Sequence, residues 1–189
     1  MGNEAVRTRR SNATRATILH AAQVRFAADG YDRATIRAIA ADARIDPSMV
    51  MRYYGSKARL FAAAVDVDLR LPDLSGVARA ELGKLLVAHF LERWEGDPGD
   101  ALLMLLRSAA TDEVARERMR HTFASQLVPV VASVVGETRE ASGRAGLIAS
   151  QLLGLAFTRH ILRLPAVVAL DRDVLIEQIG PTIQRYLIG

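Results

Sequence analysis

The amino-acid sequence predicts an all-α protein, and three observations support this fold class. The chain has 189 residues of which 50% are hydrophobic, so it can bury a substantial core. Ala, Leu and Arg dominate long stretches in which apolar residues recur with the period of a helix. Strand signals are almost absent, because no stretch alternates steadily between apolar and polar residues and no hairpin pattern occurs.

The first part of the chain predicts a basic arm followed by a helix. Residues 1–13 are polar and rich in arginine, which is typical of a flexible arm. Ile18, Ala22 and Phe26 then share one face at helical spacing. Gly30 follows the expected end of this helix, where a glycine in the left-handed conformation is common.

Two short helices are expected next, over residues 35–42 and 46–53, with a tight turn between them. Asp46 followed by Pro47 is a strong start signal for the second of them. An Asp side chain at this position accepts hydrogen bonds from the first free amides, and proline has no amide to lose at the first helical position.

Ser56 is expected to begin a fourth helix, which runs to about residue 71 and ends before Pro72. A domain boundary therefore falls near Pro72, and it separates residues 14–71 from residues 72–189. The second part predicts a bundle of five longer helices, near residues 76–95, 98–110, 112–135, 140–164 and 171–188. Pro129 and the pair Gly180-Pro181 predict kinks or breaks within them.

The charges of the chain are unevenly distributed. The net charge is +4, but residues 1–60 carry 11 Lys and Arg against 5 Asp and Glu, whereas residues 61–189 carry 14 against 16. A basic first third indicates an anionic partner, either a nucleic acid or a membrane surface. The chain has no cysteine, its N-terminus lacks the apolar core of a signal peptide, and no apolar stretch is long enough to span a membrane. We therefore expect a soluble cytoplasmic protein.

A pair of short helices around a tight turn, in the basic third of the chain, is the layout of a helix-turn-helix. Its second helix enters the major groove of DNA. The surrounding residues sharpen this interpretation, and the informative segments are Thr17-Ile18-Leu19, Gly30-Tyr31, Thr35-Ile36-Arg37-Ala38-Ile39-Ala40, Ile45-Asp46 and Tyr53-Tyr54-Gly55-Ser56-Lys57.

These segments resemble the DNA-binding domain of the TetR/AcrR family of transcriptional regulators, over about residues 14–65. The resemblance implies an N-terminal three-helix DNA-binding domain followed by a helical bundle for ligand binding and dimerisation. Two residues depart from the family pattern. Arg44 stands in the turn where the family usually has glycine, and Met51 stands where it usually has tyrosine. Arg44 predicts a strained turn, since a left-handed conformation costs a non-glycine residue about 1 kcal/mol.

The helix-turn-helix interpretation assigns the candidate DNA contacts. Exposed side chains on the second and third helices can meet base edges, and these are Arg37, Pro47, Ser48, Met49 and Arg52. Lys57 lies at the start of the fourth helix, where free amides and a positive charge suit a phosphate. The other expected phosphate contacts are Arg15, Thr35, Tyr53 and Ser56, while Tyr54 is expected in the core.

The resemblance implies that the second domain forms a homodimer and holds a small-molecule inducer. The last two helices are the candidate dimer interface because they combine apolar and small residues: Leu147, Ser150, Gly154, Leu155, Ile176, Ile183 and Leu187. The candidate ligand pocket consists of large or polar residues within the apolar bundle: His89, Phe90, Trp94, Leu103, Arg107, Met119, Phe123, Gln126, Phe157 and His160. The mixture favours a small apolar or aromatic ligand.

No catalytic motif is present, and the four histidines are scattered without the spacing of metal ligands, so we expect no enzyme, no metal and no cofactor. The expected function is that of a DNA-binding repressor, which an inducer releases from a palindromic operator on double-stranded DNA. The alternative is a helical module that binds a protein or a membrane surface through its basic N-terminal segment.

Overall fold

A computed structural model of the chain describes residues 2–94, 101–136 and 139–189, and these residues form helices and loops without any strand. The chain divides into two compact units. The first comprises the described residues of Met1–Val67 and Asp97–Arg118, and the second comprises those of Asp68–Gly96 and Met119–Gly189. The all-α fold class predicted from the sequence is confirmed.

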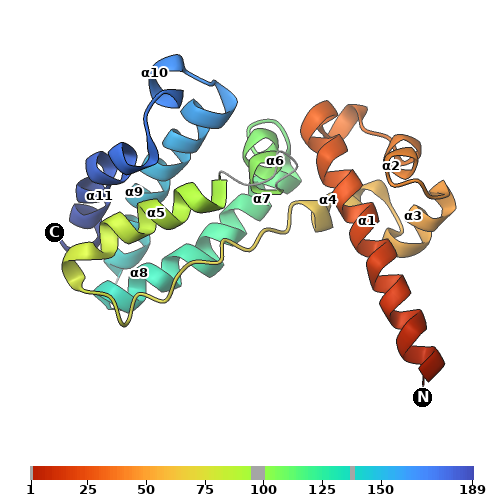
Figure 1. Cartoon of the computed structure of the whole chain (residues 1–189), viewed down its shortest axis with the longest axis horizontal. Helices are drawn as coiled ribbons and strands as arrows, with labels where there is room; N and C mark the ends of the chain where they lie inside the picture. Colours follow the sequence, from red (N-terminus) through yellow and green to blue (C-terminus); the bar gives the residue numbers. More distant parts are fainter. Residues whose placement is uncertain (1, 95–100, 137–138) are drawn as a thin grey trace. The chain divides into compact units, whose positions relative to one another are not determined.

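The first unit begins with the long helix α1 (Gly2–Arg33). Its regular course is interrupted at Gly30, whose φ of 74° matches the left-handed conformation expected there. The arm expected over residues 1–13 differs from the structure, because α1 already begins at Gly2 and its N-terminal turns extend past the other helices of the unit (Figure 1). Arginine is a good helix former, so an arginine-rich segment can continue a helix.

Helices α2 (Ile36–Asp42), α4 (Lys57–Ala64) and α6 (Ala101–Ser108) pack against α1. Helix α3 (Pro47–Tyr54) packs against α2 and α4, and the start of α7 (Glu113–Thr122) also belongs to this unit. Phe26 of α1 meets Phe61 of α4 edge to face, with ring centroids 4.9 Å apart. Tyr31 lies 4.8 Å from the same Phe61 ring, so aromatic packing fixes α4 against α1.

Helix α4 ends at Ala64, although the sequence predicts it to continue to about residue 71. Arg70 has a φ of 51°, which a right-handed helix cannot accommodate. Leu74, shortly afterwards, is buried in the core of the second unit. Leu71 and Leu74 therefore lie in an irregular segment at the start of the second unit, where they pack on its core.

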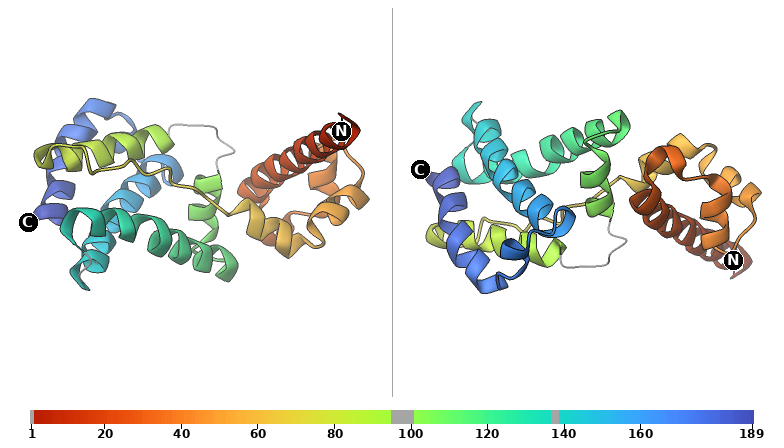
Figure 2. Two further views of the ribbon diagram at one scale, coloured as in Figure 1. Left: turned by 90° about the horizontal axis from the view of Figure 1, so that it is seen from below. Right: turned by 90° about the horizontal axis from the view of Figure 1, so that it is seen from above.

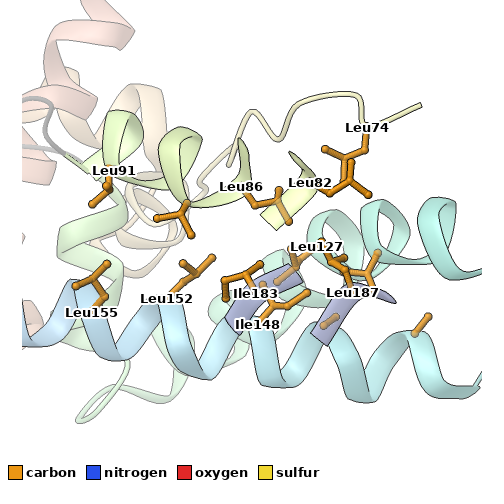
Figure 3. Packing of buried hydrophobic residues seen from close by; sticks show 14 of the residues in the cluster. Leu74, Leu82, Leu86, Leu91, Leu127, Ile148, Leu152, Leu155, Ile183 and Leu187 are labelled. Atoms are coloured by element: carbon orange, nitrogen blue, oxygen red, sulfur yellow. The ribbon is translucent and has the colours of Figure 1, made fainter. Parts of the chain in front are cut away.

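The second unit is a helical bundle (Figure 2). Its elements are η1 (Arg79–Glu81), α5 (Leu82–Trp94), a π-helical turn η2 (Phe123–Leu127), α8 (Val128–Val135), α9 (Arg139–Ala156), a second π-helical turn η3 (Phe157–Ile161), α10 (Pro165–Val168) and α11 (Arg172–Ile188). Side chains of α5, α9 and α11 fill its core, where Leu86, Leu152 and Ile183 meet (Figure 3).

Helices α5 and α11 cross at very close range. A Cβ atom added at Gly83 would lie 2.3 Å from the carbonyl oxygen of Gly180. The Gly83 amide donates to Oε1 of Gln184 at 2.7 Å, and Nζ of Lys84 pairs with Oε1 of Glu177 at 2.6 Å. Two glycines and these polar contacts thus fix the position of α11 on α5.

The expected proline distortions have different outcomes. Pro129 is the second residue of α8, directly after the π-helical turn η2. This turn provides room for a residue that has no amide hydrogen and whose ring crowds the preceding turn. Pro181, in contrast, lies inside α11 without ending it, since this helix continues from Arg172 to Ile188. Gly180, its neighbour, serves the crossing with α5 and does not mark a break.

The units differ from the domain ranges expected from the sequence. The first division falls after Val67 and not near residue 71. In addition, Ala101–Ser108 packs on α1 and belongs to the first unit, although it lies within the range 72–189. A short amphipathic helix shows in its sequence that it has an apolar face, but not which other helix covers that face.

Candidate nucleic-acid interface

The turn between α2 and α3 ends one helix and begins the next within four residues. The amide of Ile45 donates to the carbonyl of Ala40 at 3.0 Å, and Arg44 between them has a φ of 55°. This pattern, with a left-handed residue after the helix, is the usual way to satisfy the last carbonyls of a helix. The structure therefore confirms that an arginine takes the position that suits glycine.

Helix α3 is fixed at both ends. At its start, Oδ1 of Asp46 accepts a hydrogen bond from the Ser48 amide at 2.8 Å. Hydrogen bonds from the Ser48 side chain and then from its amide lower the pKa of Asp46. At its end, the Tyr54 hydroxyl donates to the Arg15 carbonyl at 3.0 Å, and burial raises the pKa of this phenol. Tyr54 is buried, as expected, and ties α3 to α1.

One face of α3 is exposed, and it carries Ser48, Met51 and Arg52 at positions i, i+3 and i+4. Of the expected base contacts, Pro47, Ser48 and Arg52 are exposed here, and Met49 is half-buried. Met51 was not among them, yet its side chain is 44% exposed at the centre of this face. The helical spacing from Ser48 could have identified it.

Arg37, the base contact expected on α2, is also exposed. The oxygens of Thr35 and Ser56 are engaged as helix caps, since they accept from the amides of Ala38 and Arg59 at 3.1 Å each. Both residues thus lie at the start of a helix, where free backbone amides are available. Such a position also suits the phosphate contacts expected for them.

Lys57 is held in place by two contacts. Its ammonium nitrogen Nζ donates to the carbonyl of Asp32 at 3.1 Å and lies 4.5 Å from the centre of the Tyr31 ring. The stem of the side chain is thereby fixed between α4 and the end of α1. An ammonium carries three N–H donors, so these contacts leave capacity for an external acceptor.

Three carboxylates of this unit are engaged within it. Arg25 binds Asp42 at 2.6 Å and Asp29 at 3.3 Å, and hydrogen bonds to these two carboxylates raise its pKa. Asp46 caps α3. Within the described ranges, no ion pair involves the arginines beside α3, which are Arg10, Arg15, Arg37 and Arg52. The surface around α3 is therefore positively charged.

In the second unit, some of the expected pocket residues lie together. The ring of Trp94 is stacked on that of His160 with centroids 5.8 Å apart, and Phe90 lies 5.4 Å from Trp94 on its own helix. Met119 and Phe123 are half-buried. Phe157 is 41% exposed, and Leu103 and Arg107 lie on α6 in the first unit.

Two other pocket candidates bind the backbone of a single residue. Oε1 of Gln126 accepts from the amide of Leu69 at 2.7 Å, and Nε2 of His89 lies 3.0 Å from its carbonyl oxygen. Leu69 comes shortly after α4 ends at Ala64. Side chains of α5 and of the turn η2 therefore clamp the segment that leaves α4, a role that sequence patterns do not reveal.

The expected dimer residues separate into two groups. Leu155, Ile183 and Leu187 are buried in the core of the chain itself, where their side chains face α5 (Figure 3), so they are not available to a partner. Ile176 is half-buried, whereas Leu147, Ser150 and Gly154 are exposed on the opposite face of α9. The sequence identified the apolar and small residues of this helix but not which of them are covered within the chain.

Among the described helices, none combines the length and the apolar character needed to cross a membrane. Within the same residues, no three His, Cys, Asp or Glu side chains gather as metal ligands would.

Two known protein families match successive parts of the chain. Residues 80–187 match the family described as the tetracyclin repressor-like C-terminal domain. Residues 18–64 match the bacterial regulatory proteins of the tetR family. No curated protein sequence matches the chain.

Solved structures resemble the chain over nearly its whole length. A TetR-family regulator from Streptomyces coelicolor A3 shares 25% identity, with a TM-score of 0.59 over 93% of this chain and 95% of that chain. A TetR-like transcriptional regulator from Rhodococcus sp. RHA1 shares 21% identity, with a TM-score of 0.70 over 93% and 96%. Another transcriptional regulator from that organism shares 22% identity, with a TM-score of 0.65 over 90% and 94%.

Proposed function

Because this chain belongs to the TetR family of DNA-binding transcriptional regulators, we propose that it is a cytoplasmic repressor that binds a palindromic operator as a homodimer. In this proposal a small molecule bound to the second unit releases the repressor from DNA. The observation that carries the proposal is the exposed face of α3, where Ser48, Met51 and Arg52 lie on a helix fixed at both ends.

The side chains of this face suit the edges of base pairs. The planar guanidinium of Arg52 can bind O6 and N7 of a guanine in the major groove. The thioether of Met51 can contact the methyl group of a thymine, and Arg37 on α2 offers a second guanidinium. Phosphates on either side are assigned to Lys57, Arg15, Tyr53 and the helix starts at Thr35 and Ser56. Contacts to phosphates position the protein, while contacts to bases specify the sequence.

The test selects duplexes from random DNA with the purified protein and measures their affinity by fluorescence anisotropy. We expect selected DNA to bind at least about 10³-fold more tightly than random DNA. Arg52→Ala should cost about 1–3 kcal/mol and relax the preference at one base pair of each half-site. A preference below about tenfold contradicts the proposal, and binding to anionic vesicles in its place supports the membrane-surface module.

Dimerisation is proposed through the outward face of α9 and the segment that follows it. Of the ten exposed large hydrophobic residues in the described chain, seven lie between Leu147 and Val174. Gly143, Gly146 and Gly154 on α9 have open space where a side chain would stand, so a partner helix can approach closely. A self-complementary face agrees with a palindromic operator, since both have two-fold symmetry.

Release by a ligand is proposed to act through Leu69. His89 and Gln126 hold this residue, and they lie on α5 and η2 close in sequence to Phe90 and Phe123. A small apolar or aromatic molecule that binds among these helices and competes for the two polar side chains would free the segment following α4. Because α4 begins with the phosphate-binding Lys57, a change in this segment alters the DNA-binding unit.

This part of the proposal is tested by ligand screening. Trp94 is the single tryptophan, so quenching of its fluorescence reports binding near Phe90 and His160. Each ligand found is then titrated into the complex with operator DNA. We expect a coupling free energy of about 1–3 kcal/mol between the two sites. DNA should therefore lower the affinity for the ligand by the same factor by which the ligand lowers the affinity for DNA. Ligands that quench Trp94 but leave the DNA affinity unchanged would show that release does not start from this region.

A further inference from the structure

The N-terminal turns of α1 lie outside the part of the chain that matches the tetR family, which begins at residue 18. Among the side chains of α1 that the structure describes, Ile18 is also the first that is buried. Between residues 8 and 17 no side chain is buried, and most are polar. These residues therefore add nothing to the apolar core and form part of the surface.

A groove of about 670 Å³ lies between this segment and α3. Its wall on α1 is formed by Thr8, Arg10, Ser11 and Thr14, and its wall on α3 by Met49, Arg52 and Tyr53. A second groove, of about 800 Å³, shares Arg52 and Tyr53 with the first and also includes Arg15 and Arg59. Both grooves therefore lie between α1 and α3.

The chemistry of the first groove favours an anion. Among the residues whose side chains are described, its lining contains two guanidinium groups, those of Arg10 and Arg52, together with hydroxyl groups and no carboxylate. The only carboxylate in the second groove, Asp66, is paired with Arg118 at 3.3 Å. Arginine with neighbouring hydroxyls is the usual protein surface for the phosphates of nucleic acid.

The dimensions fit a strand of DNA. Ten residues of helix, 8–17, span about 15 Å, and one strand of a duplex places about four phosphates along the same length of the duplex axis. Arg52 connects the two surfaces, because it belongs both to the exposed face of α3 and to the lining of the groove. A strand that leaves the base pairs read by α3 can therefore pass directly between α3 and the first turns of α1.

We propose that the groove between residues 8–15 of α1 and α3 binds the sugar–phosphate backbone of operator DNA, with Arg10 as its principal phosphate contact. This inference rests on the proposed function and extends it, because it adds a contact outside the base pairs that α3 reads. The repressor then requires a longer duplex than its recognition helices alone would cover.

The experiment compares two duplexes, one carrying the operator with about five flanking base pairs on each side and one trimmed to the operator. The proteins are the wild-type chain, Arg10→Ala and Arg139→Ala. Arg139 is the matched control because it is an exposed arginine at the start of α9 in the other unit. All three retain the residues on the exposed face of α3, so base recognition is unchanged.

We expect the wild type to bind the flanked duplex more tightly and with a steeper salt dependence than the trimmed one. Arg10→Ala should reduce the log-log salt slope on the flanked duplex by about 1 per protomer, or about 2 per dimer. On the trimmed duplex the same variant should match the wild type. Ethylation interference should show one flanking phosphate per half-site whose modification weakens the wild type but not Arg10→Ala.

Two outcomes would contradict the inference, and each has a different meaning. If the wild type prefers operator DNA but Arg10→Ala has the same slope as Arg139→Ala on the flanked duplex, the groove does not hold the backbone. If the wild type shows no preference for any duplex, the proposed function fails and the inference fails with it. Both variants change exposed side chains, and circular dichroism verifies that each one folds.

Discussion

Arg44 illustrates how a single residue can oppose the local geometry of its turn. Its φ of 55° lies in the left-handed region, which costs a residue with a side chain about 1–2 kcal/mol. The turn nevertheless forms, because the Ile45 amide reaches the Ala40 carbonyl and Asp46 begins the next helix immediately. Packing of α2 and α3 on α1 therefore outweighs a strain that the sequence alone predicted.

Replacing Arg44 with glycine is expected to stabilise the protein. Relief of the strain exceeds the additional backbone entropy that glycine loses on folding, about 0.5–1 kcal/mol, so the free energy of unfolding should increase by up to about 1 kcal/mol. Urea denaturation followed by circular dichroism measures it. The control is Ala41→Gly in α2, an exposed right-handed position, which should lose about 1 kcal/mol. A decrease for Arg44→Gly would indicate that the arginine side chain contributes more than its conformation costs.

The side-chain caps at helix starts were the most predictable features of the chain. Thr35, Asp46 and Ser56 each cap the helix that they were expected to begin, since a cap depends on residues within three positions of it. Elements fixed by distant contacts were less predictable. The early end of α4 and the assignment of α6 to the first unit depend on partners far away in the sequence. The same reasoning explains why Leu155 and Ile183 were assigned to the wrong face.

Asp46 makes the start of the recognition helix sensitive to pH. Its pKa is lowered by hydrogen bonds from Ser48, so the folded state favours the charged form. The carboxylate therefore adds stability above its unfolded pKa of about 3.9, and this contribution is lost as the pH falls through the lower folded value. The advantage of the wild type over Asp46→Asn should be present at pH 7 and disappear in acid, as measured by urea denaturation.

The variant Asp46→Ala separates the cap from the charge. Asparagine retains an oxygen that can accept the Ser48 amide, whereas alanine removes it. Asp46→Ala should therefore be less stable than Asp46→Asn at every pH, and it should bind operator DNA more weakly because the first turn of α3 carries Ser48. Equal affinity of the two variants for DNA would contradict a role of this cap in presenting α3.

The close crossing of α5 and α11 leads to a prediction about stability. Gly83→Ala places a methyl group 2.3 Å from the Gly180 carbonyl and 2.6 Å from the Gln184 amide, both of which are backbone atoms that cannot move aside alone. The cost should be about 1–3 kcal/mol, the range for overpacked cores. Gly76→Ala, in the loop before η1, is the control, because its new methyl meets open space and its φ is not positive, so it should stabilise by up to about 1 kcal/mol. Thermal unfolding of both variants makes the comparison.

At the scale of the whole molecule, the sequence predicted two functional parts more reliably than their surfaces. The basic first third and the helix-turn-helix spacing identified the DNA-binding part, because the local order of residues determines both. The surface of the second part was harder to predict. Every helix of a bundle has an apolar face, and whether that face meets the same chain, a ligand or a second copy depends on how all the helices pack.

A charge at Leu147 is expected to separate the dimer without unfolding the chain. Leu147 is 49% exposed, so Leu147→Glu costs the single chain little, whereas in a dimer it would bury an unpaired charge at a cost of several kcal/mol. Sedimentation velocity should show a dissociation constant raised by at least about 100-fold. Leu155→Glu serves as the contrast, because Leu155 is 8% exposed within the core and its replacement should lower the melting temperature. A dimer that persists in Leu147→Glu would place the two-fold axis elsewhere, and the two recognition helices would then face half-sites with a different spacing.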